Sequence, residues 1–192
     1  MDTGIKIVPF RPGWRDEFLA LGRSLRQMLR ARALRIDHIG STAVPGLAAK
    51  DVIDIQITVQ SLELAVEQAL TQAGYQRIQA VSQDHVPSGS SCHPDAWIKW
   101  LFKPAADRRK VNVHVRLSGR ANQRYPLLFR DYLRAHPAMA TSYGQLKRTL
   151  AKYHPNDLEA YYAIKDPACD LIIGGAEPWA AAIGWEPGPS DC

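Results

Sequence analysis

Cysteine and long apolar runs are both scarce in this sequence, and each absence excludes a class of protein. The three cysteines, Cys92, Cys169 and Cys192, lie far apart in a chain of 192 residues, so neither a disulfide framework nor a zinc site of paired cysteines is expected. No apolar run approaches the roughly 20 residues of a membrane-spanning helix, and the first residues hold no apolar signal segment. We therefore expect a cytoplasmic protein in a reducing compartment, without a membrane partner.

The composition that remains is ordinary for a globular protein. Hydrophobic residues make up 46% of the chain and charged residues 22%, far from the composition of disordered or fibrous proteins. The length allows one substantial hydrophobic core. We expect a single compact unit, with an α/β part over residues 1–120 and a helical part over residues 121–192 packed on it.

Acidic residues are scarce in one stretch, from Lys99 to Arg134. This stretch has ten lysines and arginines but only two aspartates, for a net charge of +8, whereas the whole chain carries +5 and the remainder therefore −3. A local excess of this size favours an anionic partner. No nucleic-acid recognition motif accompanies the stretch, so we expect a small phosphorylated ligand rather than a nucleic acid.

Hydrophobic spacing predicts an order of elements typical of the α+β class. Helices are expected over residues 14–32, 62–73, 126–136, 137–153 and 156–173, with Ser61 capping the second and Gly174–Gly175 ending the last. Strands are expected over residues 5–8, 35–39, 52–59, 75–81, 96–102 and 110–117, the last two as an antiparallel pair. The prediction is a mixed or antiparallel sheet with flanking helices, and a tail that frays after Pro178.

Polar residues occupy every second position of two predicted strands. Asp54 and Gln56 alternate with isoleucines in the first, and Asn112, His114 and Arg116 alternate with valines in the second. If the strands are neighbours, these side chains share one surface of the sheet. That surface is either a functional site or the water-facing side of a one-sided sheet.

A small-residue turn, Gly40–Ser41, follows the strand at residues 35–39. Backbone N–H groups and a hydroxyl in such a turn can bind phosphate. His38, two residues earlier, either contacts the ligand or braces the turn. Lys165 is a further phosphate-binding candidate; alternatively, its aliphatic stem packs against the protein and its ammonium group reaches solvent. The helical pair Arg130 and Arg134 would suit a phosphate or a coenzyme A tail.

The block of fifteen residues from Ile36 to Lys50, running into Ile53–Ile55, closely resembles the signature of the GrpB family of bacterial proteins. The resemblance extends over about residues 5–175, and its further matches are Val8–Pro9 with Trp14, Asn112–Val115, Phe129–Pro137, and Tyr161 with Lys165. The family is similar in turn to the nucleotidyltransferase superfamily, and to a C-terminal extension of some bacterial dephospho-coenzyme A kinases. The resemblance thus implies a nucleotidyltransferase-like fold and a nucleotide or coenzyme A derivative as ligand.

In such transferases the Gly-Ser turn holds a nucleoside triphosphate, and carboxylates on the following strands bind two Mg²⁺ ions. Here Gly40 and Ser41 match the turn, and Asp54 matches the first carboxylate. Gln56 stands at the second carboxylate position, and His114 or Asn112 at the third. The resemblance therefore implies Asp54 and His114 as catalytic residues and as ligands of Mg²⁺ or Mn²⁺, with Gln56 as a weak third ligand.

Two functions follow from this pattern. The first is transfer of a nucleoside monophosphate from a triphosphate to an acceptor, with Asp54 holding metal and His114 serving metal or proton transfer. The second is a catalytically degenerate module that binds a nucleotide or coenzyme A derivative, or assists a partner enzyme, without turnover. Gln56 in place of a carboxylate is the feature that motivates the second.

Overall fold

The computed structural model describes residues 4–90 and 93–192, which fold around one five-stranded sheet. The strands are β1 (Arg35–Ile39), β2 (Ile53–Val59), β3 (Tyr75–Arg77), β4 (Lys99–Pro104) and β5 (Val111–Leu117). Their order across the sheet is β1-β2-β5-β4-β3. β2 and β5 pair in parallel, and the other three pairings are antiparallel. The predicted α+β class with a mixed sheet is confirmed.

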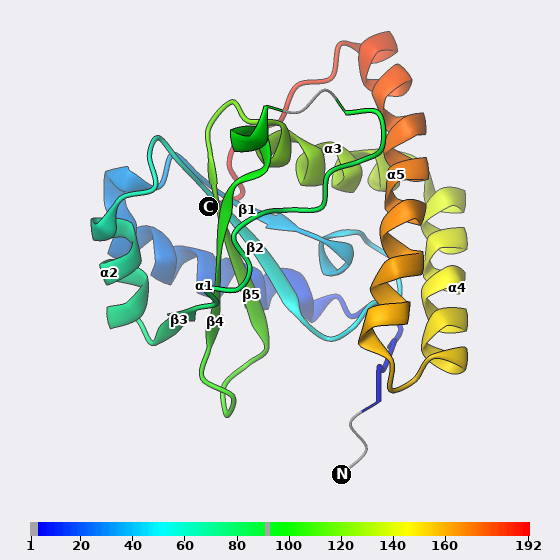
Figure 1. Cartoon of the computed structure of the whole chain (residues 1–192), viewed down its shortest axis with the longest axis horizontal. Helices are drawn as coiled ribbons and strands as arrows, with labels where there is room; N and C mark the ends of the chain where they lie inside the picture. Colours follow the sequence, from blue (N-terminus) through cyan, green and yellow to red (C-terminus); the bar gives the residue numbers. More distant parts are fainter. Residues whose placement is uncertain (1–3, 91–92) are drawn as a thin grey trace.

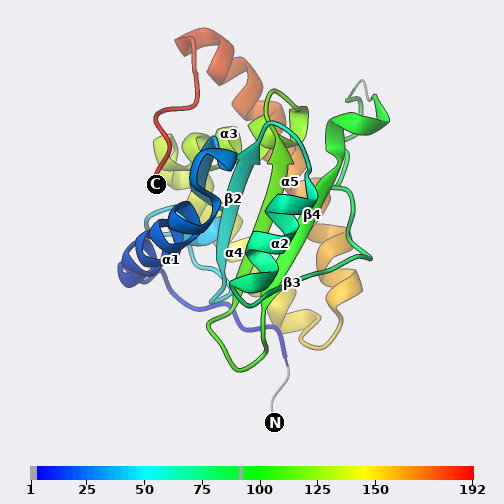
Figure 2. The same ribbon diagram turned by 90° about the vertical axis from the view of Figure 1, so that its left-hand side faces the viewer.

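Helices cover both faces of this sheet. α1 (Gly13–Leu29) and α2 (Leu64–Gln72) lie on one face, and α3 (Ala121–Ala135), α4 (Pro137–Tyr153) and α5 (Leu158–Ile183) lie on the other, as Figures 1 and 2 show. α4 has the predicted bounds, and α1 follows the predicted amphipathic spacing up to Leu29. Within the described ranges no helix is both long and apolar enough to cross a membrane.

The two sides of the sheet have different interiors. On the α1 side, the isoleucines of β2 and the valines of β5 pack against Trp14, Phe18 and Leu25 in an apolar core. On the other side, a second apolar cluster joins α3, α4 and α5 to Val44 and Leu47 in the loop before β2. Polar side chains of the sheet lie between this second cluster and the strands.

The polar face of the sheet is not a water-facing surface. Gln56, Thr58, Lys99 and Arg116 are all less than 9% exposed, because α3 and the loop between β3 and β4 cover them. The water-facing alternative is therefore wrong for this part of the sheet. The alternation of β2 and β5 indicates a buried polar layer, in which each polar group needs a protein partner.

Several predicted boundaries are wrong, for reasons of packing. α5 continues through Gly174–Gly175 to Ile183. Gly175 does not end the helix but allows close packing, because a Cβ there would lie 3.0 Å from the Tyr132 hydroxyl. α3 begins at Ala121, five residues before Pro126, since buried Asn122 holds the extra turn by donating to the Ile98 carbonyl at 2.8 Å.

Three further expectations fail near the chain's loops. Residues 5–8 form no strand but a single bridge between Val8 and Ala49. α2 begins at Leu64 and has no side-chain cap, because the Ser61 hydroxyl donates to the Glu63 carboxylate instead. β3 ends at Arg77 and β4 begins at Lys99. Cys92 lies outside the described residues.

The tail was expected to fray, but its last residues lie along the edge strand β1. The backbone N–H of Cys192 donates to the Ile36 carbonyl at 3.1 Å, and the N–H of His38 donates to the Asp191 carboxylate at 2.9 Å. An edge strand presents unpaired backbone groups. The tail satisfies several of those on β1, and this explains its order.

Candidate functional site

The turn after β1 closes directly onto the carboxylate of Asp54 in β2. Gly40 adopts a φ of 70°, and a Cβ at this position would lie 2.6 Å from Asp54 Oδ2. A side chain there would be strained by the backbone and would also collide with the carboxylate. Gly40 therefore brings the Ser41–Ala43 turn and Asp54 into contact.

His38 ties this turn to the rest of the sheet. Its Nε2 lies 3.0 Å from the Thr42 hydroxyl, which in turn donates to the Val52 carbonyl at 3.3 Å. The imidazole stacks on Phe18 with 4.7 Å between ring centroids, and burial lowers the pKa of His38 to about 4. This geometry is the one expected of the bracing role, with a neutral imidazole at neutral pH.

A buried lysine that the sequence interpretation missed lies against Ser41. Lys147 of α4 is 3% exposed, and its Nζ donates to the Ser41 hydroxyl at 2.7 Å. Burial and the charges on Lys165 and Lys50 lower the pKa of Lys147 to about 7, against the opposing effects of Cys169 and Asp54. Its spacing could have predicted this position, because Lys147 follows Tyr143 by one helical turn on the face of α4 that packs inward.

Two more lysines and an arginine surround this corner. Lys50 Nζ donates to the Tyr162 hydroxyl at 2.9 Å and lies 4.7 Å from that ring's centroid. Lys165 Nζ donates to Asp166 at 2.7 Å and lies 5.6 Å from the same ring. Arg134 Nε donates to the Ala43 carbonyl at 3.0 Å, beside the turn. Cations from four segments thus face one small region.

Asp54 lies at the open end of the polar face. It accepts a hydrogen bond from Asn112 Nδ2 at 2.8 Å, and His114 Nε2 lies 3.6 Å from the same oxygen. Burial alone would raise the pKa of Asp54, but His114 and the Asn112 amide hold it below its usual value. Burial lowers the pKa of His114. Asp54 is thus an ionised, partly exposed carboxylate, and its partners on the sheet are the Asn112 amide and the His114 imidazole.

Gln56 has both ends of its amide engaged by the protein. Its Nε2 donates to the Gln123 carbonyl at 2.9 Å, and its Oε1 accepts from Arg116 Nη1 at 2.8 Å. The side chain is fully buried. Among residues 4–90 and 93–192, no group of three or more histidine, cysteine, aspartate or glutamate side chains could hold a metal ion. The residues present therefore do not fit a two-metal centre of the transferase kind.

A second carboxylate, Asp84, enters the polar layer from the loop between β3 and β4. It accepts two hydrogen bonds from Arg116, both at 2.8 Å, and one from Lys99 at 2.6 Å. Asn122 Nδ2 adds a fourth at 3.0 Å. Despite burial, these cations hold the pKa of Asp84 far below its usual range. No strand pattern marked this residue in the sequence.

Much of the basic stretch is neutralised inside the protein. Arg116 and Lys99 pair with Asp84, and Arg109 pairs with Glu17 and Asp51. Arg130 is 3% exposed; it donates to Asp131 at 2.7 Å and to Asp191 at 2.8 Å. Of the helical arginine pair, Arg134 is the more exposed and lies at the turn.

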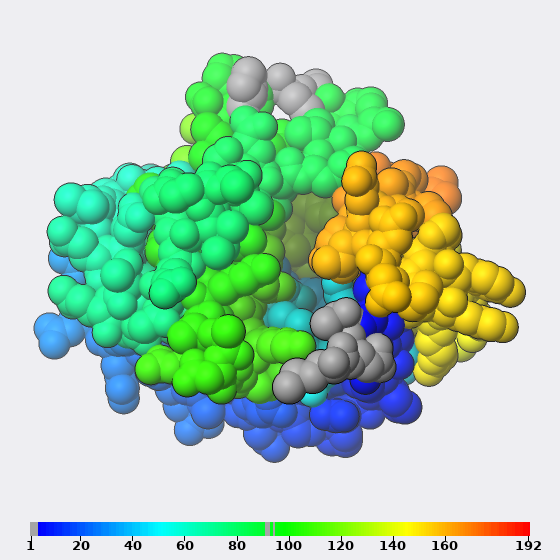
Figure 3. Space-filling model, turned by 60° about the horizontal axis from the view of Figure 1, so that its bottom comes forward, coloured from blue at the N-terminus to red at the C-terminus, as the bar shows by residue number. Residues whose placement is uncertain are grey.

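The surface is hollowed beside α5. Figure 3 shows a depression between the green segments that include β4 and the orange part of α5. The N-terminal half of α5 contributes Tyr161 and Tyr162, whose rings face Lys50, and Lys165, which faces the Tyr162 ring. In chemical terms the corner combines the Gly40–Ser41 turn, one carboxylate and several cations.

Fold and site together define a class of protein: an α+β protein in which the Gly40–Ser41 turn contacts the Asp54 carboxylate of β2, on the side of the sheet covered by α3, α4 and α5. Residues 4–174 match the family described as GrpB protein. The chain belongs to the GrpB family.

Solved and curated relatives agree with this assignment. The crystal structure of the conserved protein GrpB from Enterococcus faecalis superimposes with a TM-score of 0.73 at 30% identity, covering 91% of this chain and 99% of that one. A UPF0157 protein of Pseudomonas aeruginosa is 36% identical, over 91% of this chain and 69% of its own length.

A dephospho-CoA kinase of Mycolicibacterium paratuberculosis is 38% identical over 95% of this chain, but the match covers only 48% of that protein. The chain thus spans about half the length of several curated relatives that it matches.

Proposed function

We propose that this chain binds a small phosphorylated ligand, a nucleotide or a coenzyme A derivative, at the Gly40–Ser41 turn, and that it does so without turning the ligand over. The observation that carries the proposal is the buried contact between Lys147 Nζ and the Ser41 hydroxyl at 2.7 Å. A buried ammonium whose polar partner is a hydroxyl has a large unmet demand for an anion. A phosphate group at the turn meets that demand.

The surrounding charges suit a ligand with several negative charges. Lys50, Lys165 and Arg134 lie around the same corner, on three different elements. Lys147 is affected electrostatically by Lys50, Lys165 and Asp54, so these groups are near enough to act on one bound molecule. A single phosphate would satisfy one or two of these cations, whereas a diphosphate or triphosphate spans more of them.

The absence of turnover is supported by Gln56. The second carboxylate position of the transferase pattern holds an amide that is fixed between Arg116 and the Gln123 carbonyl. Support for a coenzyme A derivative comes from the match to half of a protein named dephospho-CoA kinase. The metal roles of Asp54, His114 and Gln56 stay predictions from the resemblance.

Ligand binding is testable with a panel of ATP, UTP, dephospho-coenzyme A, coenzyme A and inorganic pyrophosphate, each with EDTA and with Mg²⁺ or Mn²⁺. We expect at least one member to raise the melting temperature, by an amount that follows RT ln(1 + [L]/Kd) and persists in EDTA. Lys147→Met should weaken binding by about tenfold or more, since a charge-assisted hydrogen bond is worth about 1.5–3 kcal/mol.

The matched control is Lys152→Met, on the same helix but near the exposed Tyr153 ring; its affinity should equal that of the wild type. If no member of the panel shifts the melting temperature, or if both variants bind equally well, the proposed site is wrong.

Nucleotidyl transfer is the second candidate, and one observation favours it. Asp54 is ionised and in contact with the Gly40 turn, the relation that the transferase resemblance implies. The test is incubation with α-labelled nucleoside triphosphates and Mg²⁺ or Mn²⁺, comparing the wild type with Asp54→Asn. A labelled product that depends on Asp54 would replace the binding-only proposal by transfer; no product, or equal product from both proteins, would eliminate transfer.

A further inference from the structure

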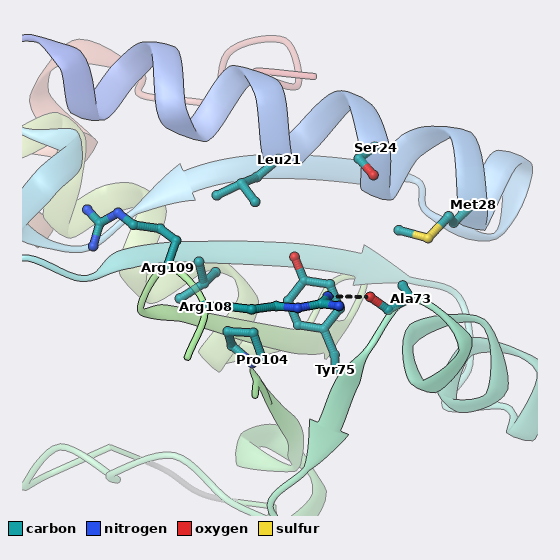
Figure 4. Close-up of a pocket in the computed structure, with 9 residues that line it drawn as sticks. Leu21, Ser24, Met28, Ala73, Tyr75, Pro104, Arg108 and Arg109 are labelled. Atoms are coloured by element: carbon teal, nitrogen blue, oxygen red, sulfur yellow. Dashed lines mark hydrogen bonds between the residues drawn. The ribbon is translucent and has the colours of Figure 1, made fainter. Parts of the chain in front are cut away.

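A cavity of about 430 Å³ lies on the side of the sheet opposite Asp54. Figure 4 shows it between α1 above and the β3 strand with the β4–β5 connection below. Leu21 and Met28 of α1 form one wall, and Val111 and Pro104 form another. Its size falls within the roughly 300–1,000 Å³ usual for small-molecule sites, and its walls are mainly apolar, as such sites are.

Two polar groups that line this cavity, Tyr75 and Arg108, have no anionic partner among the described residues. Tyr75 is 8% exposed, its hydroxyl has no hydrogen-bond partner among residues 4–90 and 93–192, and burial raises its pKa, so it stays a neutral donor. Arg108 donates weakly to the Ala73 carbonyl at 3.4 Å. Across the described ranges, no carboxylate lies within ion-pair distance of Arg108.

Arg108 is held at the cavity by the backbone beside it. A Cβ on Gly74, whose φ is +85°, would lie 2.7 Å from Arg108 Nη1, so the guanidinium packs directly on this glycine. Its charge acts on Tyr75, where it opposes the effect of burial on the pKa of the hydroxyl. The neighbouring Arg109 also lines the cavity, but it is engaged by Glu17 and Asp51. One solvent-exposed cation without an ion pair, Arg108, and one neutral donor, Tyr75, therefore line the cavity.

We propose that this cavity is a second ligand site, which binds a small monoanion with an apolar body, a carboxylate on an alkyl or aryl group. A planar guanidinium matches a carboxylate through paired hydrogen bonds, and the Tyr75 hydroxyl can donate to the same group. The apolar walls take the body of the ligand. A multiply charged phosphate finds three lysines at the Gly40–Ser41 turn but one free cation here, so the two sites select different chemistry.

The two sites are separated by the sheet. In β5 the side chain of Val111 points to the α1 side, whereas Asn112, paired with Asp54 in the register, points to the other. A ligand in the cavity therefore does not compete with one at the turn. The proposal stands whether or not the turn binds phosphate.

Octanoate and its neutral isostere octanamide are the probes, and ¹H–¹⁵N NMR titration of the wild-type chain is the measurement. We expect octanoate to shift signals of residues 21–28, 73–75 and 104–111, and to bind at least fivefold more tightly than octanamide. Arg108→Gln should weaken octanoate about tenfold and leave octanamide unchanged, because the lost interaction is with the charge.

Two variants complete the design. Lys103→Gln, on the exposed side of β4, removes an equal charge outside the cavity and should bind octanoate as the wild type does. Ser24→Trp places an indole at the cavity from an exposed position on α1 and should weaken both probes. Equal binding of the two probes, an unchanged octanoate affinity in Arg108→Gln, or shifts that map elsewhere would each overturn the proposal.

Discussion

The two carboxylates on the polar face of the sheet, Asp54 and Asp84, have opposite surroundings. Asp84 is bound by two cations and an amide, with four hydrogen bonds of 2.6–3.0 Å. Asp54 has an amide and an imidazole as sheet partners, and its side chain is about a quarter exposed. The same layer of the fold thus has a closed end and an open end.

The difference distinguishes charges that stabilise the fold by pairing inside the protein from charges that remain available to a ligand. At the closed end Arg116 and Lys99 already pair with Asp84 inside the protein, and removing any one of the three leaves a buried charge with fewer ion pairs. At the open end the carboxylate, the Gly40–Ser41 turn and Lys147 retain unmet interactions. Substitutions at the closed end should therefore affect stability, and those at the open end should affect ligand binding.

The largest effect is expected from Arg116→Ala at the closed end. The change removes both hydrogen bonds to Asp84 and the one to Gln56, and it leaves a buried carboxylate without its main partner. We expect a loss of about 3–5 kcal/mol in the free energy of unfolding, measured by urea denaturation. Arg120→Ala, at an exposed arginine, should change it by less than about 0.5 kcal/mol. A similar small change for Arg116→Ala would contradict the closed-end description.

His38 should give the next largest effect, as a pH dependence. Because its folded pKa is about 4 against 6.5 for an ordinary histidine, the unfolded chain takes up a proton that the folded chain does not. Stability is therefore complete above pH 6.5 and falls by about 3 kcal/mol as the pH approaches 4. His38→Gln should lack this part of the slope. Parallel stability curves for the two proteins between pH 7 and 4.5 would show that His38 is not buried as a neutral group.

Lys147 should produce a trend of the same sign at alkaline pH, smaller over the range tested. Its pKa of about 7 lies below the usual 10.5, so the folded protein loses a proton that the unfolded chain still holds. Relative to Lys147→Met, the wild type should gain up to about 1.4 kcal/mol for each pH unit between 7 and 9. Urea denaturation at pH 6, 7, 8 and 9 measures this difference. A constant difference across the series would mean that Lys147 titrates normally.

The smallest stability effect is expected from Asp54→Asn. An asparagine keeps the shape of the side chain and an acceptor for Asn112, and no buried cation is left unpaired. We expect a change within about 1 kcal/mol in urea denaturation. Asp84→Asn, made in parallel, should cost several times more because Arg116 and Lys99 would lose their counter-charge. Equal losses in the free energy of unfolding for the two variants would contradict the difference between the open and closed ends.

The sequence predicts the strands and the turn of the site well, because their signals are local. The alternation in β2, the Gly40–Ser41 pair and the polar alternation of β5 each lie within one element, and the register then brings Asp54 beside Asn112. The partners that decide the chemistry are distant in the chain. Asp84 is 32 residues from Arg116, and the Gln123 carbonyl that fixes Gln56 is 67 residues away.

Lys147 was only partly predictable from the sequence. Its place on the inward face of α4 is readable from the spacing of Tyr143, Leu146 and Leu150, but its contact with Ser41 spans 106 residues and depends on how α4 packs. The extension of α5 through two glycines also required tertiary information, since the contact of Gly175 with Tyr132 explains that glycine. Local patterns predicted elements, and packing determined which polar groups remain free.

The most direct test of the open end is to titrate Lys147 itself by NMR, with ¹³C-labelled lysine, in the presence and absence of inorganic pyrophosphate. The structure predicts a pKa of about 7 in the free protein. A bound anion stabilises the ammonium, so the pKa should rise by at least one unit when pyrophosphate saturates the site. A Lys147 signal that titrates near 10.5 in the free protein, or one that pyrophosphate leaves unchanged, would contradict the account.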